Sequence, residues 1–108
     1  MWQLFLDDER FPDDILGWMF ARSVDKAIEL CNIYGCPSFI SFDHDLGEVL
    51  TGKDFACWLV GRDLDEQFKF IPDDFDFYVH SQNPVGAKNI HDYLTQYFEF
   101  VKLLKIRD

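Results

Sequence analysis

Short apolar runs, separated by polar or turn-forming residues, recur along the chain. Four of these runs have the length of strands, and they cover residues 2–6, 17–22, 38–42 and 77–79. The longer runs are almost continuously apolar rather than alternating, which is typical of strands buried on both faces of a parallel sheet. The pattern therefore predicts a mainly parallel sheet.

Apolar residues at helical spacing occur between the predicted strands. Ser23 is a typical helix N-cap residue, and Gly35 suits the position just after a helix end. Thr51 is a second N-cap candidate, for a helix over residues 52–62. Strands that alternate with helices indicate βα units. Because such connections are almost always right-handed, we expect helices on both faces of the sheet.

Two parts of the chain depart from this regular alternation. Residues 11–16 contain a proline and two aspartates, so a loop with little room for a helix is expected between the first two strands. Asn83 and Pro84 begin a third helix that runs to about Phe98. The structure of residues 98–108 stays open, because Phe98, Val101 and Leu104 continue the helical spacing while residues 98–103 fit a fifth, edge strand equally well. The predicted fold is a three-layer parallel α/β sheet of four to five strands, with its first helix reduced or absent.

The composition indicates one cytoplasmic domain. The 108 residues suffice for one hydrophobic core, so a single domain over residues 1–108 is expected. Twelve Phe, three Trp and four Tyr supply large side chains to bury. No apolar run approaches the roughly 20 residues that cross a bilayer, and no signal-peptide pattern is expected at the start. Three cysteines without paired ligand spacing predict reduced thiols.

The net charge of −10 restricts the partners of the protein. Twenty acidic residues against ten basic ones repel a polyanion over most of the surface. Binding to duplex DNA is therefore not expected. A small phosphorylated ligand or an RNA terminus remains a candidate partner, provided that a metal ion offsets the charge locally.

Polar clusters directly follow three of the predicted strands. They are Asp7-Asp8-Glu9, Asp43-His44-Asp45 and His80-Ser81-Gln82-Asn83. In a parallel sheet the C-terminal ends of the strands lie along one edge, and ligands of open α/β folds bind outside that edge. We therefore expect the three clusters to form one site.

Carboxylates that are brought together repel each other unless they share a cation or a proton. Asp7 or Asp8 together with Asp43 offer hard oxygen ligands, which suit Mg²⁺ or Mn²⁺. Any one of these acids on its own is as readily explained as a solvated loop residue. The convergence of several of them is what predicts a metal site.

The other polar residues of the clusters are suited to phosphate chemistry. His44 and His80 are candidate general acids or bases because the pKa of histidine lies close to neutral pH. Ser81 and Asn83 are candidate donors to a phosphoryl oxygen, with helix capping as the alternative role of Asn83. Arg10 is a weaker candidate for a phosphate clamp.

Three ordered motifs resemble a known family. They are Leu-Asp-Asp-Glu-Arg at 6–10, Ser-Phe-Asp-His-Asp-Leu-Gly at 41–47, and His-Ser-x-Asn-Pro-x-Gly-Ala at 80–87. Together they are similar to the cyclic-phosphate-processing receiver domains, a divergent branch of the receiver (flavodoxin-like) fold of two-component signalling. The resemblance covers nearly the whole chain. It implies metal binding by the acidic pair and Asp43, and an activity on cyclic phosphate ends in RNA repair and related systems.

The chain also departs from an ordinary receiver. An ordinary receiver has a helix between its first two strands and a lysine–proline pair after its fifth strand. Here neither Lys102 nor Lys105 is followed by proline. This argues against a switch that depends on that lysine.

The resulting hypothesis is a metal-dependent phosphoesterase that acts on a cyclic phosphate. Mg²⁺ or Mn²⁺ is expected on Asp7, Asp8 and Asp43, joined by the backbone carbonyl of Asp45. Asp43 is a metal ligand or, alternatively, the nucleophile. Two further hypotheses are a non-catalytic, receiver-like phosphate-binding or signalling module and an acidic interaction or inhibitor module.

Overall fold

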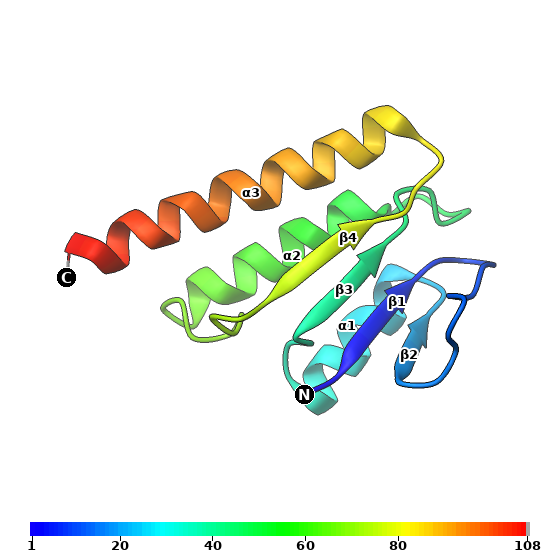
Figure 1. Ribbon diagram of the computed structural model, residues 1–108, viewed down its shortest axis with the longest axis horizontal. Coiled ribbons are helices and arrows are strands. Elements are labelled where there is room, and N and C mark those ends of the chain that lie inside the picture. The colour runs from blue at the N-terminus through cyan, green and yellow to red at the C-terminus, as the bar shows by residue number, and fades with distance from the viewer. Residues whose placement is uncertain (108) are drawn as a thin grey trace.

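The structure is a computed structural model that describes residues 1–107, with side chains for residues 1–105. It contains four strands and three helices (Figure 1). In chain order they are β1 (Gln3–Leu6), β2 (Trp18–Ala21), α1 (Val24–Tyr34), β3 (Phe39–Phe42), α2 (Gly52–Asp65), β4 (Asp76–Val79) and α3 (Pro84–Arg107).

The strands form one parallel sheet in the order β2-β1-β3-β4. Residues 7–17 join β1 to β2 as a loop that contains no helix. The expected receiver-like α/β fold with a missing first helix is therefore confirmed. The predicted caps are also found, since the Ser23 side chain accepts a hydrogen bond from the Lys26 N–H and Thr51 forms a capping box with Asp54.

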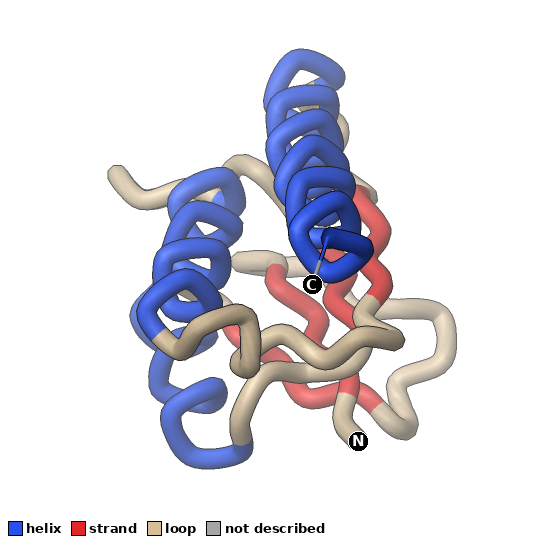
Figure 2. The backbone as a smooth tube through the Cα atoms, turned by 90° about the vertical axis from the view of Figure 1, so that its left-hand side faces the viewer, coloured by secondary structure: helices blue, strands red, loops and turns tan. Residues whose placement is uncertain are grey.

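All three helices lie on one face of the sheet, although helices were expected on both (Figures 1 and 2). The connections from β2 to β3 and from β3 to β4 run in the same direction across the sheet. Two right-handed connections in the same direction place their helices on the same side. A helix on the opposite face would have to come from the β1–β2 connection, which is a loop here. The α3 helix then packs along α2.

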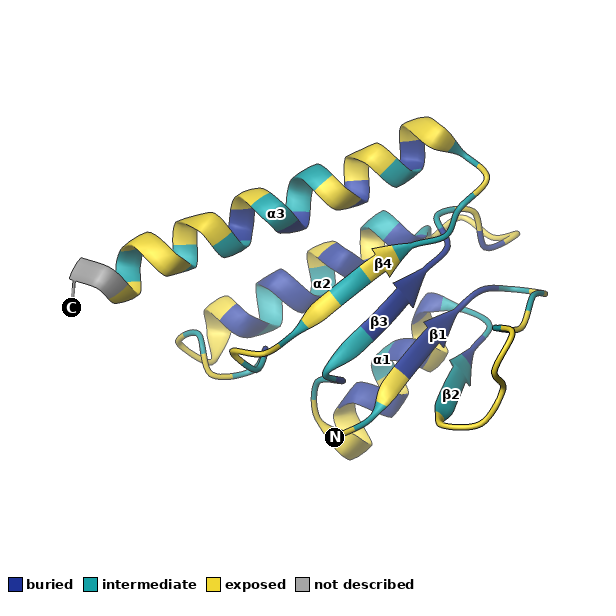
Figure 3. Ribbon diagram, in the orientation of Figure 1, coloured by how far each residue is buried: buried dark blue, intermediate teal, exposed yellow. Residues whose placement is uncertain are grey.

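The hydrophobic core fills the space between the helices and the sheet. The central strands β1 and β3 are largely buried, whereas the edge strand β4 is only half-buried or exposed (Figure 3). The large apolar side chains that are fully buried are Leu4, Leu6, Ile40, Phe42, Phe55, Leu59, Ile90 and Leu94.

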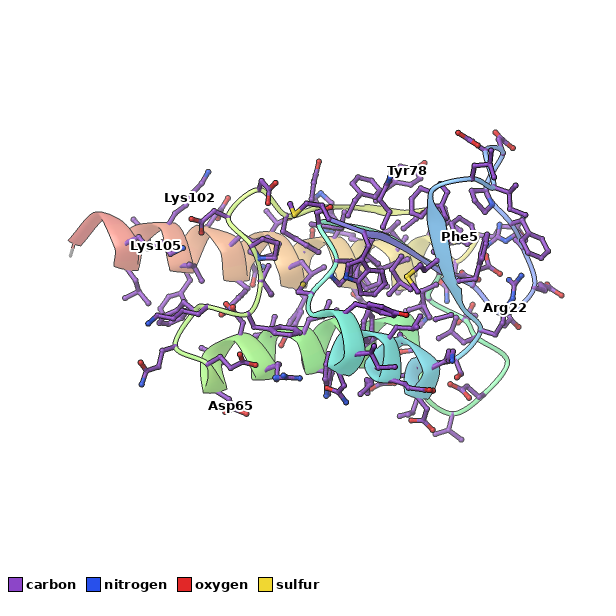
Figure 4. All side chains as sticks on the ribbon, turned by 90° about the horizontal axis from the view of Figure 1, so that it is seen from below. Phe5, Arg22, Asp65, Tyr78, Lys102 and Lys105 are labelled. Atoms are coloured by element: carbon purple, nitrogen blue, oxygen red, sulfur yellow. The ribbon has the colours of Figure 1, made fainter. Side chains whose placement is uncertain are left out.

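An aromatic layer covers the helix-free face. Phe5 meets the rings of Trp18 and Phe20 edge-on, at centroid distances of 5.7 Å and 6.2 Å. Trp18 meets Phe39 in the same way at 5.9 Å. Phe5 is 6% exposed although no helix covers it, while Tyr78 near the open edge is 60% exposed. Figure 4 shows Phe5 and Tyr78 on the side of the sheet that faces away from α2.

The C-terminal segment is a helix, so the sheet has four strands and not five. Phe98 packs against Phe75 and Phe77 at centroid distances of 5.6 Å and 6.4 Å, which favours continuation of α3 over an edge strand. The last residue of the ambiguous segment, Asp108, lies outside the described residues. None of the helices within residues 1–107 combines length with the apolarity of a membrane span.

Candidate functional site

The ends of β1, β3 and β4 bring the three polar clusters together. The Asp43 N–H donates to the Leu6 carbonyl at 2.8 Å, and the His80 N–H donates to the Phe42 carbonyl at 2.9 Å. The hydrogen-bond ladder thus extends one residue past the strands, and Asp7, Asp43 and His80 lie in one row. Their potential ligand atoms all lie within 4.8 Å of one another. The predicted convergence of these three residues is therefore found.

Asp7 is a buried anion that is fully engaged by its neighbours. Its carboxylate accepts hydrogen bonds from the N–H groups of Glu9 (2.9 Å) and Arg10 (2.8 Å), from Arg10 Nε (2.9 Å) and from His80 Nε2 (2.9 Å). Burial alone would raise the pKa of Asp7, but these hydrogen bonds and the Arg10 charge lower it to about 2. Asp7 is therefore ionised and holds the site together.

Arg10 bridges the two acidic strand ends. Its Nε contacts Asp7 at 2.9 Å, and its Nη2 lies 3.3 Å from Asp43 Oδ2. Burial opposes the charge of Arg10, but the two carboxylates outweigh it and raise the pKa of the guanidinium. The side chain is 38% exposed, so its remaining N–H groups are accessible to a ligand.

His80 is fixed at both ring nitrogens. Nδ1 lies 2.7 Å from Ser41 Oγ, Nε2 lies 2.9 Å from Asp7, and the ring stacks on Phe5 at 4.6 Å. The order Ser–His–Asp is that of a nucleophilic triad. Ser41, however, is 5% exposed inside β3, so its hydroxyl positions the His80 ring rather than meeting a substrate.

Arg22, which the sequence did not single out, holds the β1–β2 loop. Its Nη1 donates to the carbonyl oxygens of Asp7 (2.9 Å) and Arg10 (2.7 Å), and its guanidinium lies 4.3 Å from the centroid of the Phe11 ring. Figure 4 shows Arg22 next to this loop. Arg22 therefore fixes the main chain that carries Asp7 and Arg10. Its position directly after a strand was the only signal in the sequence.

A cavity of about 420 Å³ opens beyond the strand ends. Its lining residues are Asp8, Glu9, Arg10, Asp43, Asp45, Gly47, Ser81, Gln82 and Asn83. This lining contains four carboxylates and one guanidinium, which makes the cavity strongly negative. Every predicted phosphate-binding residue lines it, whereas Asp7, His44 and His80 are not among its lining residues.

His44 reaches the cavity wall through Asp45. His44 Nδ1 lies 2.8 Å from Asp45 Oδ1, and Asn83 Nδ2 lies 3.3 Å from Asp45 Oδ2. The hydrogen bond to His44 and then the one to Asn83 lower the pKa of Asp45. Asn83 also caps α3, because its Oδ1 accepts from the Gly86 N–H at 3.0 Å. Both roles considered for Asn83, capping and a polar contact in the site, are thus compatible.

Two glycines permit close approach around the site. A Cβ at Gly86 would lie 2.4 Å from the His44 ring, and a Cβ at Gly52 would lie 2.0 Å from the Asp43 carbonyl oxygen. The starts of α3 and α2 can therefore pack directly against the residues that follow β3. Neither close approach was predicted from the sequence, although Gly86 is part of the motif at 80–87.

The donor set fits a hard divalent cation. Asp8 and Asp43 line the cavity together with Asp45, and oxygen donors of this kind suit Mg²⁺ or Mn²⁺. Within the described part of the chain, the Asp8 carboxylate accepts no hydrogen bond, so its oxygens are available. The Asp7 carboxylate is already saturated by four donors. Asp8 and Asp43 are therefore better placed than Asp7 to hold an ion.

The sequence matches a protein family described as the cyclic-phosphate processing receiver domain, over residues 2–96. The match includes all three polar clusters and ends within α3. Neither the curated proteins nor the solved structures yielded a match.

Proposed function

Because the chain belongs to the cyclic-phosphate processing receiver domain family, we propose that it hydrolyses a cyclic phosphate ester with the help of a divalent metal ion. The observation that supports this is the composition of one cavity. Four carboxylates and a guanidinium surround it, together with a hydroxyl and two amides. The carboxylates repel a phosphate unless a cation accompanies it, and the other groups can donate hydrogen bonds to a phosphate.

Arg10, Ser81 and Asn83 bind the phosphate. Arg10 presents the N–H groups that Asp7 and Asp43 leave unused. Ser81 Oγ accepts from the Asn83 N–H at 3.1 Å, which leaves its proton for a phosphoryl oxygen. The Asn83 amide contributes Nδ2, which already points to Asp45. These donors hold the phosphorus in a fixed position for attack.

Asp8 and Asp43, with Asp45, hold Mg²⁺ or Mn²⁺. The ion, when bound, offsets the charge of the carboxylates and of the phosphoryl oxygens. Asp43 is 6% exposed and borders the cavity, so it remains the candidate to accept the proton of the attacking water or to attack phosphorus itself. In either case one ring P–O bond breaks, and the leaving oxygen takes up a proton. If Asp43 attacks phosphorus, water then hydrolyses the aspartyl phosphate and regenerates the carboxylate.

His44 is the better placed of the two histidines for this proton. Asp45 orients its ring through Nδ1, and within the described residues Nε2 has no hydrogen-bond partner. His80 uses both nitrogens to hold Asp7 and Ser41. A catalytic role for His80 stays a prediction, and it requires that one of these hydrogen bonds be released.

Turnover of 2′,3′-cyclic nucleotides by the purified protein tests the proposal. We expect product formation with Mg²⁺ or Mn²⁺ and none with a chelator. D8N and D43N should be inactive, whereas H44Q and H80Q should reduce the rate to different extents. A panel of cyclic and linear phosphoesters without any turnover, with either ion, would rule out the enzyme.

Such a result would favour the non-catalytic alternative. A signalling receiver predicts a stable adduct with beryllofluoride and no hydrolysis. One observation disfavours it: within the described residues no lysine lines the cavity. Lys105 instead contacts Asp73 at 2.6 Å, and Lys102 borders another cavity with it.

A further inference from the structure

The cavity contains its own cation. Arg10 is the single basic residue in its lining, against four carboxylates. The guanidinium lies between Asp7 and Asp43, at 2.9 Å and 3.3 Å. This is where the ligand atoms of Asp7, Asp43 and His80 approach within 4.8 Å of one another. Arg10 thus neutralises, in part, the repulsion that a metal ion would otherwise relieve.

We propose that Arg10 couples metal binding to phosphate binding. The inference rests on the proposed function, because it concerns the same ion and the same phosphate. With no ligand present, Arg10 is bound to Asp43. When a divalent ion neutralises Asp43, Arg10 Nη2 is released and donates to the phosphate instead.

The attachment of Arg10 allows this movement. The Arg10 N–H and Nε are both bonded to Asp7, and the Arg10 carbonyl accepts from Arg22 at 2.7 Å. The backbone and the inner part of the guanidinium are therefore held in place. The contact with Asp43 is the longest of the set at 3.3 Å, and the side chain is 38% exposed. The guanidinium is planar, so a small rotation of the whole group about its Nε anchor turns Nη2 away from Asp43 and into the cavity.

Electrostatics determines the sign of the coupling. A guanidinium bound to Asp43 repels a second cation at that carboxylate, so Arg10 weakens metal binding as long as no phosphate is present. A bound phosphate attracts both the guanidinium and the metal ion. Arg10 can then leave Asp43, and the metal ion can bind that carboxylate. By linkage, phosphate must then strengthen metal binding by the same factor by which the metal strengthens phosphate binding.

Calorimetric titration of Mg²⁺, with and without inorganic phosphate, tests this coupling. In the wild type, phosphate should tighten Mg²⁺ binding by about tenfold or more. In R10Q, Mg²⁺ alone should bind about tenfold tighter than to the wild type, and phosphate should add little. R10K keeps the charge and should retain weak Mg²⁺ binding. K88Q removes a charge from α3 outside the cavity and should behave as the wild type does.

Two results overturn the inference. If phosphate does not change the Mg²⁺ affinity of the wild type, the two sites are not coupled. This measurement needs no variant. An R10Q protein that binds Mg²⁺ equally or more weakly shows that Arg10 only positions the carboxylates. If the wild type still turns over cyclic phosphate in these cases, the proposed function stands. If no protein of the set binds Mg²⁺, the metal-dependent function fails as well.

Discussion

Asp7 carries its charge in a place that water does not reach. Its exposure is 0%, and the pKa is lowered from 3.8 to about 2 by its four donors and the Arg10 charge. A carboxylate whose pKa is lower in the folded than in the unfolded protein stabilises the fold at pH values above its unfolded-state pKa. That contribution is lost as the pH falls from about 4 towards 2, and the lowering of the pKa from 3.8 to about 2 corresponds to about 2 kcal/mol.

We therefore expect D7N to lower the free energy of unfolding by about 2 kcal/mol at pH 7. The difference from the wild type should shrink between pH 4 and pH 2, because only the wild type loses a charge there. Urea titrations at several pH values measure both quantities. D13N, which removes an exposed loop carboxylate, is the matched control and should have little effect. An equal loss at pH 7 and pH 2 would contradict the electrostatic explanation.

Gly86 is the residue that makes room for His44. In G86A the new Cβ would lie 2.4–2.7 Å from three atoms of the His44 ring, so the ring has to move. We expect the variant to fold, because Ala favours a helix over Gly by about 1 kcal/mol. Turnover of a cyclic nucleotide should fall by about tenfold to a hundredfold, since the ring loses its position against Asp45.

G61A is the control for G86A. Gly61 also lies in a helix, but a Cβ there meets nothing within 4 Å. This variant should keep full activity and gain up to about 1 kcal/mol of stability. The chemical shifts of the His44 ring report the displacement directly. Unchanged shifts and activity in G86A would show that His44 does not need its observed place.

The site residues could be predicted from the sequence wherever the end of a strand could be predicted. Asp7, Asp43 and His80 each follow an apolar run, and parallel pairing then places them in one row. The function of Ser41 was not predictable in this way, because a serine inside a strand carries no mark of its partner. Its contact with His80 depends on the register of β3 and β4, which only the folded sheet determines.

At the scale of elements, one buried carboxylate ties α2, α3 and the loop before β4 together. Asp63 accepts hydrogen bonds from the N–H groups of Phe70 (3.0 Å) and Ile71 (2.8 Å) and from the Tyr97 hydroxyl (2.6 Å). Burial raises the pKa of the Tyr97 hydroxyl most, and its hydrogen bond to Asp63 raises the pKa further. The helix predicted from the sequence ended at residue 62, whereas α2 continues through Asp65 and includes the buried Asp63.

We expect Y97F to destabilise the fold by about 1–3 kcal/mol, because the buried carboxylate loses a donor that water does not replace. Y78F removes a hydroxyl from an exposed tyrosine of β4 and should change stability by less than about 0.5 kcal/mol. Thermal or urea unfolding of the two variants makes the comparison. Equal stability of Y97F and the wild type would mean that the two backbone donors suffice for Asp63.

The ambiguous C-terminal segment shows where local pattern stops being informative. An apolar run over residues 98–103 fits a helix and a strand equally well by spacing alone. The ambiguity is removed by Phe98, which packs against Phe75 and Phe77. Those partners lie more than 20 residues earlier, so no short window of sequence contains the information.

At the scale of the whole molecule, the missing first helix has two consequences. It leaves one face of the sheet to an aromatic layer built on Phe5, and that layer also supports the ring of His80. It also replaces the helix by the loop that carries Asp8 and Arg10 into the cavity. The departure from an ordinary receiver is therefore part of the site itself.

The net charge of −10 also acts on the molecule as a whole. Like charges repel more strongly in the compact fold than in the unfolded chain, so salt should stabilise the protein by screening. Mg²⁺ should do more than NaCl at equal ionic strength, because binding to the folded state adds to screening. At ten times the dissociation constant the addition is about 1.4 kcal/mol, or several degrees in Tm.

If the stabilisation by Mg²⁺ depends on one particular carboxylate, the ion binds at a site; if it does not, the ion acts by general screening of charge. D8N should keep the gain from NaCl and lose the additional gain from Mg²⁺, because Asp8 borders the cavity. D74N removes an exposed acid outside the cavity and should keep both gains. Thermal unfolding of the three proteins in the two salts gives all the values. If D74N and D8N respond alike to Mg²⁺, the ion acts on the overall charge, because a bound ion has to distinguish between the two carboxylates.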